Sequence, residues 1–179
     1  MKLARPARTG CHALAVLVLS ASAWAAPEPA TTVRGTVTEV LDGNRLTLTP
    51  AGGAPIAVRL RDIDAPDLCQ PWGEDARRAL AEMALNKPAA LRASGRDAQG
   101  RTLARVWVDE VDLGRHMVEE GQAWSLRTRF DQGPLVKQER MAHALGRGLH
   151  GAGVAVMPRD YRRSHGPCPA PAGPSAAKH

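Results

Sequence analysis

The chain has 179 residues, of which 44% are hydrophobic, and a formal net charge of +6. This length and apolar content suit a single domain with a buried core, and the mild positive charge permits contact with a polyanion without requiring it. No apolar run approaches the roughly 20 residues that a membrane-spanning helix needs, which argues against an integral membrane protein.

The first 25 residues have the pattern of a secretory signal peptide. A basic segment precedes an apolar one, and a small-x-small cleavage motif follows, in the order Lys2, Arg5 and Arg8, then Ala13 to Leu19, then Ala23-Trp24-Ala25. We therefore expect export to the periplasm or out of the cell, with residues 1–25 removed. These residues carry three basic and no acidic side chains, so their removal leaves a net charge of +3.

Three strands are predicted after a Pro/Ala/Thr-rich linker at residues 26–32. Alternation in Val33–Val40, a turn at Asp42-Gly43-Asn44 and a short strand at Leu46–Leu48 predict a hairpin. A second turn at Ala51–Pro55 leads into a third strand. In that strand Ile56, Val58 and Leu60 alternate with Ala57, Arg59 and Arg61, so one face can be buried.

The third strand runs into a turn that concentrates charge. Asp64 and Asp67 flank Pro66, where side chains are displayed rather than buried. These two carboxylates follow Arg59 within nine residues, which indicates a site that handles charge. The alternative is a surface strand whose arginine and aspartate residues serve only solubility.

The remainder of the chain alternates helices and strands. Helical spacing predicts a helix over Gly73–Asn86, another around Leu113–Glu120 that Gly121 ends, and a third over Gly133–Arg147. Strands are predicted at Ala89–Ala93 and Arg101–Val108. This order suits a mainly β fold with about three α-helices, namely a five-stranded OB-fold barrel spanning residues 33–150.

The C-terminal residues 151–179 are expected to form a partly disordered tail. Pro, Ala and Gly dominate from Gly166 onward, and Arg162 and Arg163 are interpreted as solvated surface. Once the signal peptide is removed, Cys69 and Cys168 remain as an even pair in an oxidising compartment, which predicts a disulfide that tethers the tail near Asp67.

The charged residues predict a particular chemistry. Oxygen ligands such as Asp64 and the Asn44 amide suit a hard cation like Ca²⁺. Two planar guanidinium groups, those of Arg59 and Arg101, suit a phosphate because each can bond two of its oxygens. A cation, two arginines and a spare carboxylate together describe phosphodiester hydrolysis.

Several segments resemble the thermonuclease family, the staphylococcal-nuclease-like proteins. The resemblance covers about residues 33–149 and implies an OB-fold that cleaves DNA and RNA with Ca²⁺. It rests on Val37–Val40 with Asp42-Gly43-Asn44, Val58-Arg59-Leu60, Ile63-Asp64-Ala65-Pro66-Asp67, Gly73 with Ala76, Asp97–Ala104, and Leu113 with Val118–Trp124.

The resemblance implies roles for individual positions. Arg59 and Arg101 match the family's phosphate-binding arginines. Asp64 matches a calcium ligand, and Ala65 matches a position that ligates the ion through its backbone carbonyl. The implied cofactor is Ca²⁺, the implied partner is a nucleic-acid substrate, and the chain is expected to act as a monomer without stable membrane association.

Two departures from the family pattern weaken the expected activity. Asn44 stands where the family has a second aspartate ligand, with Arg45 after it in place of threonine, and an amide brings no charge to the ion. Asp67 stands where the family has the glutamate that handles the attacking water, and it is one methylene shorter. We therefore expect an attenuated nuclease, and the alternative is an inactive OB-fold module that binds nucleic acid or a protein partner.

Overall fold

Five strands carry the core of the chain. The computed structural model describes residues 32–153 and 156–169, so the expected signal peptide and the linker up to residue 31 lie outside the described residues. The five strands are β1 (Thr32–Asp42), β2 (Arg45–Thr49), β3 (Ile56–Leu60), β5 (Pro88–Arg96) and β6 (Thr102–Val108).

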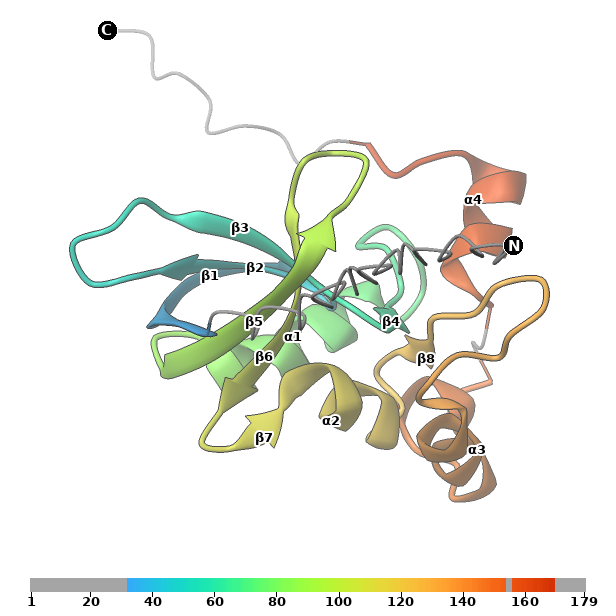
Figure 1. Cartoon of the computed structure of the whole chain (residues 1–179). Coiled ribbons are helices and arrows are strands. Elements are labelled where there is room, and N and C mark those ends of the chain that lie inside the picture. Colours follow the sequence, from blue (N-terminus) through green and yellow to red (C-terminus); the bar gives the residue numbers. More distant parts are fainter. Residues whose placement is uncertain (1–31, 154–155, 170–179) are drawn as a thin grey trace, which may run out of the picture.

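These strands close into a mixed barrel (Figure 1). Neighbours in the order β3-β2-β1-β5-β6 pair antiparallel, and a parallel pairing of β3 with β6 closes the ring, with Arg59 opposite Leu103. The prediction of a five-stranded OB-fold barrel is confirmed. A two-residue strand, β7 (Val111–Asp112), extends the sheet by pairing with β6. Two further two-residue strands, β4 (Ile63–Asp64) and β8 (Trp124–Ser125), pair with each other in a separate sheet.

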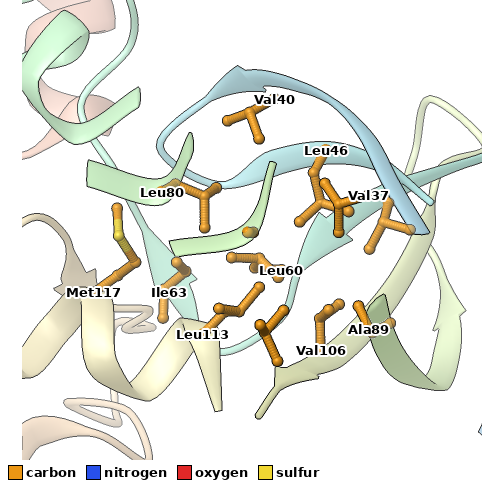
Figure 2. Packing of buried hydrophobic residues seen from close by; sticks show 14 of the residues in the cluster. Val37, Val40, Leu46, Leu60, Ile63, Leu80, Ala89, Val106, Leu113 and Met117 are labelled. Atoms are coloured by element: carbon orange, nitrogen blue, oxygen red, sulfur yellow. The ribbon is translucent and has the colours of Figure 1, made fainter. Parts of the chain in front are cut away.

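The barrel interior is filled by the apolar face that the sequence alternation predicts. Val58 and Leu60 on β3 and Ala104 and Val106 on β6 are buried, whereas Arg59 between them is only half-buried. In Figure 2 the labelled barrel side chains, Leu60 and Val106 among them, belong to a layer of apolar side chains that continues to Leu113, Ile63 and Met117. One continuous core therefore joins barrel and helices.

The described residues also form four α-helices. They are α1 (Gly73–Ala84), α2 (Leu113–Glu119), α3 (Val136–Ala144) and α4 (Pro158–His165), with a 3-10 turn at Gly148–His150. The first three lie where helices were predicted, although α3 is shorter than 133–147: Leu135 precedes its first residue, and Gly146, in the left-handed region at φ 62°, follows its end. No helix of the described chain is apolar over a span long enough to cross a bilayer.

Helix α4 is the element that the sequence analysis did not predict. It lies within the expected tail 151–179, and Figure 1 shows it apart from the barrel strands, on the side of the molecule where β4 and β8 lie. Residues 166–169 follow it within the described part, and the rest of the predicted disordered end, residues 170–179, lies outside the described residues.

Candidate active site

The β1–β2 turn presents Asn44. The Asp42 carboxylate accepts a hydrogen bond from the Asn44 backbone N–H at 2.9 Å and also pairs with Arg45, which makes a self-contained Asx turn. The Asn44 carbonyl accepts a hydrogen bond from the Leu60 N–H at 2.8 Å, which ties the turn to β3. Asp42 is thus occupied within the turn, whereas the Asn44 amide side chain has no hydrogen-bond partner in the described part of the chain.

Gly43 allows this turn to pack closely against α1 and against Ala65, the residue that follows β4. A Cβ atom at Gly43 would lie 2.8 Å from the Cβ atoms of both Ala65 and Ala76, which is closer than van der Waals contact allows. Glycine at this position therefore lets the turn that carries Asn44 lie directly against Ala65, next to Asp64.

Arg59 and Asp64 face each other from β3 and β4. The Arg59 Nη2 lies 3.6 Å from the Asp64 Oδ1, and the Asp64 side chain is only 8% exposed. Burial raises the pKa of Asp64, while the positive charges of Arg162 and Arg59 act in the opposite direction. Asp64 is therefore a buried carboxylate whose nearest cations in the described structure are too distant for good hydrogen bonds.

Arg101 is held at the end of the β5–β6 turn by two neighbours. The Asp97 carboxylate accepts hydrogen bonds from the Arg101 backbone N–H at 3.0 Å and from its Nε at 2.6 Å. The Gln99 side chain accepts a hydrogen bond from Arg101 Nη2 at 3.0 Å. These contacts fix the stem of the guanidinium group before any substrate arrives, which lowers the cost of ordering it on binding.

Asp67 lies on the turn that connects β4 to α1. Its carbonyl accepts a hydrogen bond from the Gln70 N–H at 2.8 Å, and the Gln70 carbonyl accepts one from the Gly73 N–H at 2.9 Å. A Cβ atom at Gly73 would lie 2.2 Å from the Asp67 carbonyl oxygen. The first residue of α1 therefore sets the position of the Asp67 backbone. The Asp67 carboxylate itself pairs with Arg162 Nη1 at 2.7 Å.

The structure brings most of the predicted site residues to one cleft of about 420 Å³. Ala65, the predicted backbone-carbonyl ligand, is buried beside Asp64 but does not line this cleft. The wall residues are Asp42, Asn44, Arg45, Arg59, Asp64, Asp67, Gln99, Arg101, Arg162, Pro167 and Cys168. Arginine and carboxylate side chains thus meet in a space large enough for a nucleotide-sized ligand.

The cleft offers oxygen donors, the ligand type that a hard cation prefers. No group of three or more His, Cys, Asp or Glu side chains suited to a metal occurs among residues 32–153 and 156–169. Asp64 nevertheless offers a buried carboxylate without a close partner, and Asn44 offers an amide without one. Oxygen donors of this type suit Ca²⁺, with water completing the shell, although a single charged ligand makes weak binding the expectation.

The sequence analysis missed Arg162. Its guanidinium lies 2.7 Å from the Asp67 carboxylate and 4.0 Å from that of Asp64, so it belongs to the cleft and not to a solvated surface. The signal that could have located it is the cysteine pair. Cys69 and Cys168 are joined by a disulfide with a Cα–Cα distance of 5.7 Å, and a bridge two residues after Asp67 necessarily brings the residues before Cys168 close to that turn.

Comparison with known proteins identifies the family. The model of the staphylococcal nuclease homologue family matches residues 57–150, which is more than half of the chain. The chain belongs to this family. The match includes Arg59, Asp64, Asp67 and Arg101, whereas Asn44 and Arg162 lie outside it.

Several curated proteins are similar to the chain over most of their length. Protein ParB of Escherichia coli is 35% identical over 162 residues, covering 84% of this chain and 88% of that protein. An uncharacterized endonuclease of Haemophilus influenzae is 32% identical over 128 residues, covering 71% of each. Micrococcal nuclease of Shigella flexneri is 30% identical over 175 residues, covering 92% and 97%. Membership of this family supports a nuclease function with a nucleic-acid substrate.

Proposed function

We propose that this protein is an exported, calcium-dependent nuclease that hydrolyses phosphodiester bonds in DNA and RNA with little sequence preference. The observation that carries the proposal is the convergence of Arg59, Arg101, Asp64 and Asp67 on one cleft. Little sequence preference is expected because Arg59 and Arg101 bind the phosphate in this proposal, and phosphate contacts carry no sequence information directly.

Each side chain has a defined task in this proposal. Arg59 and Arg101 bind the phosphate and neutralise the charge that develops on its oxygens. Asp67 accepts a proton from the attacking water as the new phosphorus–oxygen bond forms, and the leaving oxygen takes its proton from solvent as the old bond breaks. Asp64 and Asn44 would hold Ca²⁺, which supplies further positive charge beside the phosphate.

The proposed activity is attenuated for two physical reasons. Asn44 contributes no charge to the cation, so the site binds Ca²⁺ more weakly than one with two carboxylates. Asp67 is one methylene shorter than glutamate, so its carboxylate lies about 1 Å from the position that a glutamate would reach, and misplacement on that scale costs roughly 100-fold in rate.

Export is part of the proposal because the first 25 residues have the signal-peptide pattern and the Cys69–Cys168 disulfide suits an oxidising compartment. A second candidate function is a non-catalytic module that binds nucleic acid or a protein partner through the same cleft. The observation that favours it is the ion pair that already engages the Asp67 carboxylate.

A cleavage assay separates the two functions. The protein is incubated with single-stranded DNA and with RNA in millimolar Ca²⁺, with and without a chelator, beside an Arg101→Ala variant. The proposal expects chelator-sensitive cleavage that the variant loses, by about 10²–10³-fold for one charge-stabilising donor. Binding of the DNA by the protein without any cleavage would instead establish the non-catalytic binding module.

A further inference from the structure

Arg162 lies between the two carboxylates of the cleft. Its Nη1 is 2.7 Å from Asp67 Oδ2 and its Nη2 is 4.0 Å from Asp64 Oδ2. The Arg162 side chain is 40% exposed, whereas the Asp67 side chain is 28% exposed. The contact to Asp67 uses one carboxylate oxygen and leaves the other without a hydrogen-bond partner among the described residues.

The segment that carries Arg162 is fastened to the Asp67 turn on both sides. Before Arg162, the Gln70 side chain donates a hydrogen bond to the Val156 carbonyl, and the Tyr161 hydroxyl donates one to the Cys69 carbonyl at 3.2 Å. After Arg162, the disulfide joins Cys168 to Cys69. All three attachments end on Cys69 or Gln70, two and three residues after Asp67.

We propose that Arg162 is a positioning residue for Asp67 and that the Cys69–Cys168 disulfide holds Arg162 in place. This inference rests on the proposed nuclease function. A short carboxylate on a surface turn can rotate freely, and an ion pair to one oxygen restricts the other oxygen to a narrow range of directions towards the water. In this proposal the disulfide-anchored segment 156–169 forms one wall of the active site and contributes to catalysis by positioning Asp67.

The position of Arg162 favours this role over a blocking one. With the guanidinium in place, the cleft still has a volume of about 420 Å³, and Arg162 forms part of its wall. Pro167 and Cys168, from the same segment, form another part of that wall. Space for a phosphate and a water therefore coexists with the Arg162–Asp67 ion pair.

Steady-state kinetics on single-stranded DNA tests the role of Arg162. Arg162→Ala should lower kcat by about 10- to 100-fold with KM changed by less than about threefold, because positioning acts on the chemical step. Arg162→Lys should recover part of kcat. Arg163→Ala is the matched control. The Arg163 side chain is 77% exposed and pairs only with Asp160 among the described residues, so this variant should keep kcat within about twofold of the wild-type value.

A disulfide-free variant tests the second half of the proposal. The double variant Cys69→Ser/Cys168→Ser should have a kcat as low as that of Arg162→Ala. Adding Arg162→Ala to the double variant should cause little further loss, because both changes remove the same Arg162–Asp67 ion pair. Circular dichroism at the assay temperature establishes that each variant is folded, and Arg162→Ala leaves the disulfide intact in any case.

The outcomes distinguish this inference from the proposed function. A wild-type kcat in Arg162→Ala, a kcat above the wild-type value, or a loss confined to KM would overturn the positioning role alone. A folded disulfide-free variant with full kcat would overturn the tethering role. If the wild-type protein cleaves neither DNA nor RNA, both this inference and the nuclease proposal are wrong.

Discussion

Replacing Gly73 with alanine should disturb the site without replacing any charged residue. The added Cβ would lie 2.2 Å from the Asp67 carbonyl oxygen and 2.8 Å from the Leu68 Cα, both backbone atoms that cannot swing aside. Reaching an ordinary contact requires the Asp67 turn to move by about 1 Å, and misplacement of that size costs roughly 100-fold in rate. Overpacking should cost about 1–3 kcal/mol, partly offset by the higher helix propensity of alanine.

The assay compares Gly73→Ala with Gly114→Ala, a matched substitution in the first turn of α2. A Cβ atom at Gly114 meets no atom closer than 3.5 Å, so this variant should keep wild-type stability and turnover. Urea denaturation measures the free energy of unfolding, and initial rates on single-stranded DNA measure turnover. Full turnover in a folded but destabilised Gly73→Ala protein would refute the claim that the placement of Asp67 limits the reaction.

Three further predictions follow from the same structure. The Cys69–Cys168 disulfide closes a loop with a sequence separation of 99, so reduction should lower the free energy of unfolding by about 3–5 kcal/mol in urea denaturation, and an unchanged midpoint would count against this. Burial lowers the pKa of His150 below its ordinary value of 6.5, so folding favours the neutral ring, and stability should fall as the pH drops from 6.5 through the folded-state pKa. His150→Gln should flatten this dependence in melts across that range, whereas an identical profile would show that other groups cause it. Asn44→Asp combined with Asp67→Glu should raise turnover by up to roughly 100-fold, and no gain would mean that their roles are assigned wrongly.

Local sequence patterns were sufficient to predict most of the barrel. Alternation on β3 and β6 predicted which side chains face inward, because a strand with one buried face must repeat its apolar residues every second position. The closing pair is different: β3 and β6 are parallel and more than 40 residues apart, and no local pattern encodes that contact. The order of strands and helices suggested a closed five-stranded barrel, and the family resemblance implied the same OB-fold.

The site was predicted only in part, because local sequence patterns reveal residues that lie close together in the chain and not those that meet through long-range contacts. Arg59, Asp64 and Asp67 lie within nine residues, so a strand followed by a turn was enough to associate them. Arg162 is 95 residues from Asp67, and apart from Pro158 and Tyr161 its helix is polar, without the apolar stripe that reveals a packed helix. The helix has only terminal signals, a proline at its start and basic residues in its last turn. Its placement depends on contacts to residues 69 and 70. The disulfide among them was predicted from the sequence, whereas the hydrogen bonds of Gln70 and Tyr161 become visible only in three dimensions.

The most direct test of the nuclease cleft is the turnover of Arg59→Ala measured beside Arg78→Ala. Arg59 faces Asp64 within the cleft, whereas Arg78 is 64% exposed on α1 and pairs with Asp75. With Ca²⁺ and single-stranded DNA, Arg59→Ala should lose about 10²–10³-fold in kcat/KM, and Arg78→Ala should match the wild-type protein. Equal cleavage by a folded Arg59→Ala protein and the wild type would contradict the assignment of this cleft as the site of phosphodiester hydrolysis.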